Sequence, residues 1–455
     1  MLKNIISKFK KGDGLTAKAS RQVVYSAISQ GTSIIISLLY VPLLLKYLTQ
    51  ERYGIWLTLT SIIGWFSFFD IGMGNGMRNK LAEANAKGEK ELGRKYVSTT
   101  YALLICIFAS ILVVFHIINP FINWNIVLNS KSISFTELYI LTSVVFTFFI
   151  LRFIVQLIGV IYMADLKPSV NNAVNAISSL FSLLFVLLLT KFSTQGDLVL
   201  LGSVITIMPV LLFVLLSIYA FNTKYAYLSP SFKHIDLKLN KGLMSLGAKF
   251  FLLQVTSVVL YSTSSFFIAQ FYGNKEVVVY NLVFKYFQMP IMAYTILLTP
   301  LWSSVTNAYT NKDFVWLKTT MKRLNLISLV VIAGIIMMIF FSDFVFKLWL
   351  GKQQAADVKI PFILTLLMAL YSIMNVFIAP YSYFVNGTGK LKLTMLFSVI
   401  GIALYFISIY LFGHKFTNSS GVLIAILIPY FLFTIIQPLQ AYKVMNQKAT
   451  GIFNQ

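Results

Sequence analysis

The chain has 455 residues, of which 58% are hydrophobic and only 11% are charged, and its mean hydropathy is +0.80. Soluble domains are nearer half apolar and a quarter charged, so a water-soluble fold of this length could not bury the excess of apolar side chains. The composition therefore predicts a membrane protein.

A net charge of +23 would favour a nucleic-acid partner in a soluble protein. Here the basic residues lie in short runs between apolar stretches, so we exclude nucleic acid.

Metal and cofactor chemistry has little support in the sequence. The single cysteine, Cys106, lies inside an apolar segment, and the three histidines, His116, His234 and His414, are widely scattered. No disulfide framework, thiolate metal cage or histidine metal site can be assembled from these residues. We expect neither a metal nor a cofactor.

Apolar stretches of roughly 18 or more residues mark the membrane spans, and the chain has about twelve of them. The links between the stretches are mostly short, so function must be carried by the helices and their ends. The predicted spans are Gln22–Leu45, Gly54–Gly72, Tyr96–Ile118, Thr136–Tyr162, Val170–Thr190, Leu198–Tyr219, Phe250–Phe271, Val277–Ser304, Leu324–Phe346, Ile360–Val385, Leu393–Phe412 and Gly421–Tyr442.

The distribution of Lys and Arg predicts the orientation, because these residues collect on the cytoplasmic side of a membrane protein. With the N-terminus inside, 26 of the 37 basic residues fall in cytoplasmic segments, nine fall on the opposite side, and Arg152 and Lys285 fall within spans. This bias predicts that both termini are cytoplasmic.

The basic, apolar N-terminus resembles a signal peptide, but its apolar run is too long and lacks a cleavage site, so we expect a retained first span.

A polar link divides the chain into two halves of six spans each. We expect a cytoplasmic amphipathic tail at residues 1–21, an N-terminal bundle at 22–219, a cytoplasmic linker at 220–249, a C-terminal bundle at 250–442 and a cytoplasmic tail at 443–455. Two halves with an even number of spans enter the membrane in the same orientation, as in transporters built from parallel repeats.

Two cations lie inside predicted spans. Arg152 is about 11 residues from the cytoplasmic end of its span, which at 1.5 Å per residue places it roughly 16 Å deep. Lys285 lies about 8 residues, or roughly 12 Å, inside its span by the same rise. A charge at the bilayer centre costs about 3 kcal/mol or more and normally marks a polar path. Lys285 could instead extend its ammonium to the surface, and Arg152 could form a structural ion pair.

No intramembrane acid stands opposite these cations in the sequence, so an anionic substrate would neutralise them, and arginine suits phosphate or carboxylate. Polar side chains within the spans could bind sugar hydroxyls, with interhelical hydrogen bonding as the alternative. They are Gln30, Gln156, Gln254, Tyr261, Ser264, Asn281, Tyr286, Gln288, Asn375, Tyr381 and Tyr383. Of these, the glutamines, the asparagines and Tyr261 are our predicted substrate-binding residues.

A glycine-rich segment, Asp70–Asn79, ends the second span. A nucleotide-binding loop would follow a β-strand rather than a membrane helix. We expect a flexible helix end at which Asp70, Arg78 and Asn79 form a gate or coupling element, with a simple helix stop as the alternative.

Enzyme signatures are missing from the sequence. We find no phosphate-binding lysine loop, no zinc-protease motif, no nucleophile elbow and no paired carboxylates within the spans. Transport requires no covalent chemistry and is consistent with this pattern, so we expect that the protein is not an enzyme.

Several segments early in the chain carry a resemblance to a known family. Pro42–Leu45, Tyr53–Trp56 and Phe69–Asn79 resemble the bacterial polysaccharide repeat-unit flippases, of O-antigen or capsule type. These belong to the multidrug/oligosaccharidyl-lipid/polysaccharide exporter (MOP) superfamily. The design of two six-helix halves with a central link is similar over nearly the whole chain.

The resemblance implies two helical bundles around a central cationic cavity that opens alternately to each side of the bacterial cytoplasmic membrane. The implied substrate is an undecaprenyl-diphosphate-linked oligosaccharide, with its diphosphate held by Arg152 and Lys285. The implied partners are this lipid-linked glycan, membrane lipids, and the polysaccharide polymerase with its chain-length machinery.

Two alternatives remain at this stage. The first is a cation-coupled multidrug exporter of the same superfamily, which would be expected to use carboxylates deep in its spans. The second is a membrane polysaccharide polymerase, which would require a large external loop with catalytic arginines or histidines. The longest candidate loop, residues 119–135, has only Lys131 as a cation.

Overall fold

The protein is described by a computed structural model that covers residues 15–66, 73–192, 196–239, 259 and 262–454. These residues form α-helices joined by turns and short 3₁₀ helices, and none of them lies in a β-strand. The predicted all-helical class is confirmed for this part of the chain.

Nine helices in the described part are long and apolar enough to cross a membrane. Each overlaps one predicted span, which supports a multi-pass membrane protein. They are Val24–Tyr47, Lys90–Phe121, Phe135–Ala164, Pro168–Lys191, Leu198–Asn222, Phe314–Leu350, Phe362–Thr388, Lys392–Phe412 and Ser420–Met445.

Three further predicted spans are not among these nine. Parts of Gly54–Gly72 and of Phe250–Phe271 lie outside the described residues. The third, Val277–Ser304, is contained in the helix α12 (Asn274–Thr310), where Asn281, Lys285 and Gln288 make the sequence less apolar. The number of twelve spans and the cytoplasmic termini remain predictions.

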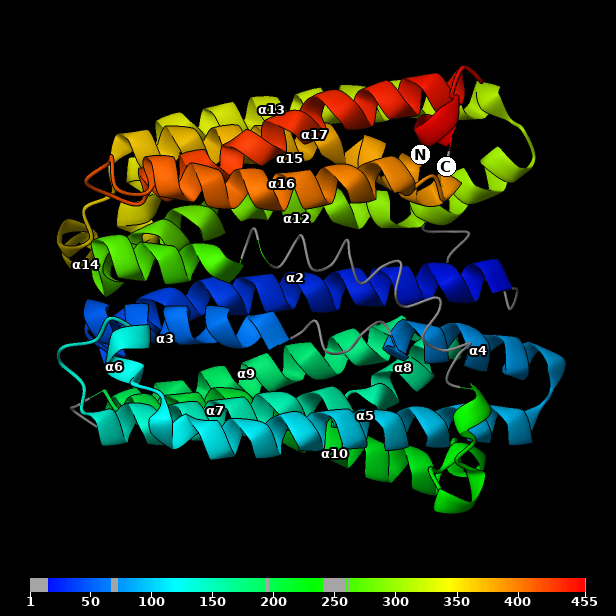
Figure 1. Cartoon of the computed structure of the whole chain (residues 1–455), viewed down its shortest axis with the longest axis horizontal. Coiled ribbons are helices and arrows are strands. Elements are labelled where there is room, and N and C mark those ends of the chain that lie inside the picture. The colour runs from blue at the N-terminus through cyan, green and yellow to red at the C-terminus, as the bar shows by residue number, and fades with distance from the viewer. Residues whose placement is uncertain (1–14, 67–72, 193–195, 240–258, 260–261, 455) are drawn as a thin grey trace. The chain divides into compact units, whose positions relative to one another are not determined.

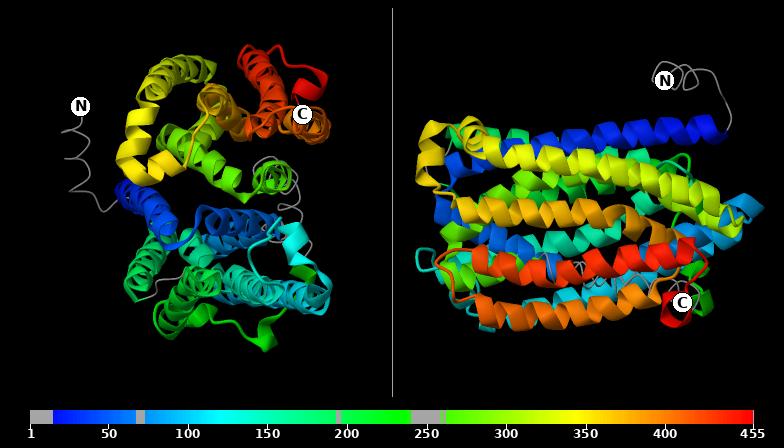
Figure 2. Two further views of the ribbon diagram at one scale, coloured as in Figure 1. Left: turned by 90° about the vertical axis from the view of Figure 1, so that its left-hand side faces the viewer. Right: turned by 90° about the horizontal axis from the view of Figure 1, so that it is seen from above.

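The chain packs into two compact units (Figures 1 and 2). The first comprises Met1–Arg52 and Ile63–Leu252, and the second comprises Tyr53–Ile62 and Leu253–Gln455. The division falls inside the helix α3 (Gln50–Gly64), whose middle residues group with the second unit.

The first unit is built from long helices that lie side by side. α2 packs on α9, α10 packs on α7 and α9, α5 packs on α7, and α4 packs on α5 and α8. Their bounds are α2 (Leu15–Tyr47), α4 (Met73–Lys87), α5 (Lys90–Ile118), α6 (Trp124–Val127), α7 (Phe135–Val155), α8 (Leu157–Ala164), α9 (Pro168–Phe192) and α10 (Leu198–Asn222).

The second unit centres on α15. α15 packs on α12, α13 and α17, and α16 packs on α17. Pro380 lies inside α15, and Pro429 and Pro438 lie inside α17. The bounds are α12 (Asn274–Thr310), α13 (Phe314–Leu350), α14 (Lys352–Asp357), α15 (Phe362–Thr388), α16 (Lys392–Phe412) and α17 (Ser420–Met445).

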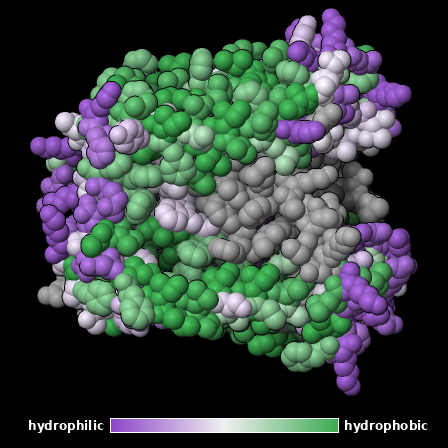
Figure 3. All heavy atoms as spheres, in the orientation of Figure 1, coloured by the Kyte–Doolittle hydropathy of each residue, from purple (hydrophilic) through white to green (hydrophobic). Residues whose placement is uncertain are grey.

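Within each unit, apolar side chains cover most of the visible length of the helices, and hydrophilic side chains gather at the helix ends (Figure 3). On α13, for example, Phe340 is 80% exposed and Leu348 is 74% exposed. Apolar surface of this kind is stable against lipid tails rather than water.

The glycine-rich segment is partly described. Asp70 lies outside the described residues, and Met73 begins the regular helix α4, so Met73–Asn79 form its first turns, while the gate at Asp70, Arg78 and Asn79 stays a prediction. Met73, Met77 and Leu81 recur every four residues and are buried. This apolar stripe fixes one face of α4 against the unit despite the glycines between its members.

The first three residues of the predicted linker, 220–222, belong to α10. Residues 223–239 follow and contain the 3₁₀ helices η3 (Ala226–Leu228), η4 (Phe232–His234) and η5 (Leu237–Leu239). It is bound to α5, because Arg94 Nε donates to the carbonyl of Ser229 at 2.9 Å and the amide of Asp236 donates to Thr99 Oγ1 at 2.9 Å. This part of the linker therefore packs with the first unit.

Candidate functional site

Arg152 lies in the last turn of α7, inside the membrane span Phe135–Ala164. It is 12 residues before the end of that span, or about 18 Å at 1.5 Å per residue. Its Nη2 donates to Oδ1 of Asn175, on α9, at 2.9 Å. Arg152 takes part in none of the ion pairs found among the described residues. A neutral amide can hold the guanidinium in place, but it cannot neutralise its charge.

α7 ends at Val155 and α8 begins at Leu157, and both belong to one continuous span. Gln156, between them, keeps helical angles (φ −70°, ψ −10°), and its backbone N–H donates to the carbonyl of Arg152 at 2.9 Å. Residues four apart share a helix face, so the structure brings Arg152 and Gln156 together.

Lys285 lies in α12 of the second unit. Asn281 precedes it by four residues and Gln288 follows it by three, so the three predicted substrate residues lie along one helix face. Asn281 Nδ2 donates to the carbonyl of Val277 at 2.9 Å and to Ser265 Oγ at 3.3 Å. Like Arg152, Lys285 takes part in no ion pair among the described residues.

Asn375 lies in a pocket of about 300 Å³ in the second unit, formed by α12, α15, α16 and α17. The pocket is lined by Ile291, Thr295, Asn375, Ile378, Ala379, Ser382, Tyr383, Val385, Asn386, Thr394, Ser398, Tyr430, Phe433 and Gln437. Ser382 Oγ donates to Gln437 Oε1 across it.

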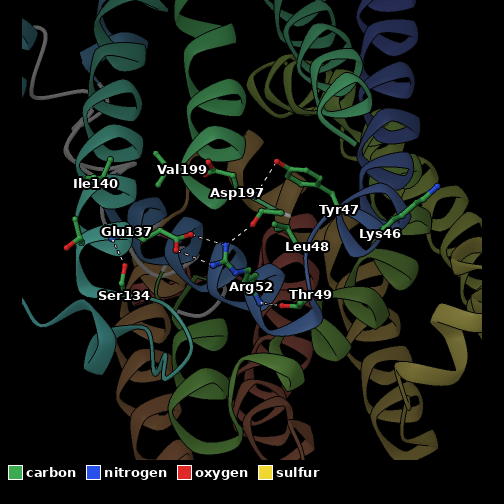
Figure 4. A pocket seen from close by; sticks show the side chains of 12 residues that line it. Lys46, Tyr47, Leu48, Thr49, Arg52, Ser134, Glu137, Ile140, Asp197 and Val199 are labelled. Carbon is green, nitrogen blue, oxygen red and sulfur yellow. Dashed lines mark hydrogen bonds and ion pairs between the residues drawn. The ribbon is translucent and has the colours of Figure 1, made fainter. Parts of the chain in front are cut away.

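A pocket of about 960 Å³ lies at one end of the first unit, where α2 ends and α7 and α10 begin (Figure 4). In it the Arg52 guanidinium points toward Glu137 and forms a two-fold pair with that carboxylate, at 2.9 and 3.2 Å. Arg52 Nη1 also donates to the carbonyl of Gly196 at 2.7 Å. Because Glu137 already neutralises Arg52, this pair holds the ends of three helices together and leaves little free charge for a substrate.

The remaining predicted residues are not gathered at these positions. Gln30 is exposed on α2, and Arg78 and Asn79 are exposed on α4. Gln254, Tyr261 and Asp70 lie outside the described residues.

Sequence reasoning missed Asn175, which binds Arg152, and Ser382, Asn386 and Gln437, which line the pocket around Asn375. The available signal was a polar side chain inside an apolar span, as for Gln437 between Ile436 and Pro438.

The fold is that of transporters of the MOP superfamily. A multidrug-resistance MATE family transporter of this superfamily, solved in an inward-facing conformation, matches with a TM-score of 0.74 at 13% identity, covering 93% of this chain and 98% of that one. An outward-facing MATE structure matches with a TM-score of 0.66 at 15% identity, covering 97% and 98%. At these identities the similarity establishes the fold alone.

The chain belongs to the family of polysaccharide biosynthesis proteins, whose sequence model matches residues 19–305. A protein of Yersinia pseudotuberculosis named for O-antigen export is 25% identical over 377 residues, covering 80% of this chain and 82% of that protein. A protein of Salmonella typhi named as an O-antigen transporter is 23% identical over 390 residues, covering 83% and 85%. The family inferred from the early spans is confirmed.

Proposed function

We propose that this protein moves lipid-linked oligosaccharide repeat units from the cytoplasmic to the outer leaflet of the bacterial cytoplasmic membrane by alternating access. The substrate would be an undecaprenyl-diphosphate-linked glycan destined for a surface polysaccharide. Family membership and the names of the two relatives support transport of this class of substrate. A polysaccharide polymerase would then receive the translocated units.

The observation that carries the proposal is the environment of Arg152. An arginine deep in a membrane span, held by a neutral amide and paired with no described carboxylate, requires an anion to offset the cost of its charge. A diphosphate offers oxygens that fit the planar guanidinium in a two-fold pair. Lys285, on α12 of the second unit, is the second cation that we propose for substrate binding.

The proposal is tested in a strain that lacks this protein. Its lipids are extracted, and undecaprenyl-diphosphate-linked oligosaccharide is measured together with surface polysaccharide. We expect the lipid-linked units to accumulate on the cytoplasmic face while the surface polysaccharide is lost. Unchanged levels of both would contradict the proposal and favour the small-molecule exporter.

The role of Arg152 is tested in the same strain. Arg152→Ala should fail to restore surface polysaccharide although the variant is inserted in normal amount, because the anion would lose its main contact. Arg323→Ala, a matched control at an exposed position on α13, should restore it fully. Normal polysaccharide in the Arg152→Ala strain would remove this residue from the mechanism.

A further inference from the structure

The pocket around Asn375 has the size and place of a ligand site. Its volume of about 300 Å³ is at the lower end of the range for small-molecule pockets and corresponds to one compact ligand. Along α15 it runs from Asn375 to Asn386, which is about 16 Å at 1.5 Å per residue. Asn386 lies at the end of α15 that precedes Lys390 and Lys392, the end that the distribution of basic residues predicts to be cytoplasmic.

The chemistry of the lining is polar and uncharged. Nine of its residues carry neutral hydrogen-bonding groups, three carry aromatic rings, of which two are tyrosines counted in both sets, and none of the described lining residues is charged. A cationic ligand would find no carboxylate there, an anionic ligand would find no Lys or Arg, and an acyl chain would leave the amides and hydroxyls without partners. The lining therefore favours a neutral ligand rich in hydroxyl groups.

Individual groups show unused hydrogen-bonding capacity. Thr394 Oγ1 is shielded from solvent and has no hydrogen-bond partner among the described residues. Gln437 is only 6% exposed, and its Oε1 accepts a hydrogen bond from Ser382, which leaves its amide nitrogen as a donor. Buried polar groups in a membrane protein are costly unless they are satisfied. A ligand with several hydroxyls could both donate to Thr394 and accept from Gln437.

We propose that this pocket binds a neutral sugar residue of the transported glycan. The inference rests on the proposed function and assigns the sugar to the second unit, separately from the cation Arg152 in the first. Amide side chains present a donor and an acceptor side by side, which suits adjacent sugar hydroxyls, and Tyr430 and Phe433 offer apolar ring surface to the sugar carbons.

The test compares two lipids that differ only in the glycan: bare undecaprenyl diphosphate, and the same lipid carrying the repeat unit of the host. Dissociation constants are measured for purified full-length protein in lipid nanodiscs. Gln437→Ala should weaken binding of the glycan-bearing lipid about threefold to tenfold, the effect of one lost hydrogen bond, and leave binding of the bare lipid unchanged. Arg152→Ala should weaken both.

Asn386→Ala provides a second variant in case Gln437→Ala fails to fold, and it should act in the same selective way. Gln440→Ala is the matched control. It removes another buried amide from α17, one that donates to the carbonyl of Lys390 at 2.9 Å and does not line the pocket, and both affinities should stay at the wild-type value.

The outcomes separate the two proposals. If the pocket variants weaken binding of both lipids equally, or of neither, the sugar pocket is overturned while the proposed function stands. If the wild-type protein binds neither lipid, the proposed function is overturned, and the sugar pocket with it.

Discussion

Two arginines of the first unit show how the surroundings decide the role of a residue. Arg52 lies at the end of the bundle, pairs with Glu137 in a two-fold geometry and also binds the carbonyl of Gly196. Arg152 lies inside a span, and within the described part of the chain its guanidinium donates to the side-chain amide oxygen of Asn175 and forms no ion pair. The first arrangement satisfies its charge within the protein, and the second leaves it available for an anion.

The pair between Arg52 and Glu137 should contribute measurably to stability. The two side chains are 27% and 25% exposed, so solvent screens the pair only partly. A double-mutant cycle with Arg52→Ala and Glu137→Ala, read from unfolding in detergent, should give a coupling energy of about 1 kcal/mol. Additive effects of the two single changes would show that the pair contributes nothing.

Asp165, between α8 and α9, should make the stability of the first unit depend on pH. Burial raises the pKa of this carboxyl, but hydrogen bonds from Lys224, Tyr225 and Lys167 outweigh burial, so its pKa lies below the usual value. A lowered folded-state pKa stabilises the fold above the unfolded pKa of about 4, and this stabilisation is lost as the pH falls through the folded-state pKa.

Asp165→Asn should therefore be less stable than the wild type at pH 7, by less than about 1 kcal/mol because the group is partly exposed. The difference should shrink as the pH falls below about 4. Thermal unfolding in detergent between pH 3 and 7 measures both effects. A difference that stays constant over this range would show that the charge of Asp165 has no part in it.

At the scale of elements, close approach between helices depends on single glycines. Within the second unit, a Cβ on Gly54 of α3 would lie 1.8 Å from the carbonyl oxygen of Asn274, where α12 begins. Thr58, one turn along α3, donates to Asn274 Oδ1 at 3.3 Å. The backbones of these two helices can approach this closely only because position 54 has no side chain.

Gly54→Ala should lower the free energy of unfolding by about 1–3 kcal/mol, because the backbone of α12 must move to admit the methyl group. Gly334→Ala on α13 is the control, since a Cβ there meets no atom within 4 Å. It should be neutral, or stabilising by up to about 1 kcal/mol through helix propensity. Equal losses in both variants would contradict this account of Gly54.

At the scale of the whole molecule, the main open prediction is the orientation in the membrane. The protein has one cysteine, Cys106, so a Cys106→Ser background allows single cysteines to report their side of the membrane. Lys131→Cys should react in whole cells with a membrane-impermeant maleimide, and Lys238→Cys should react only after the cells are opened. The reverse pattern would invert the predicted topology.

Much of the candidate site was predictable because a polar residue in an apolar run is visible without a structure. Arg152, Lys285, Asn281 and Asn375 were identified in this way. The helix that begins at Met73 was missed because the glycines of that segment indicated a break. Its stability comes from buried Met73, Met77 and Leu81, and tertiary packing of such a face outweighs helix propensity.

The membrane class, the apolar helices and the family could be predicted from the amino-acid sequence alone, because each depends on local composition and short motifs. Which polar groups contact one another could be learned only from the packing of the helices. Arg52 forms a hydrogen bond with Glu137, which lies 85 positions away in the sequence, and Ser382 forms one with Gln437, 55 positions away. Neither contact can be predicted from the local sequence, because membrane-spanning helices bring together residues that are far apart in the chain. Helix packing determines which helix faces are in contact.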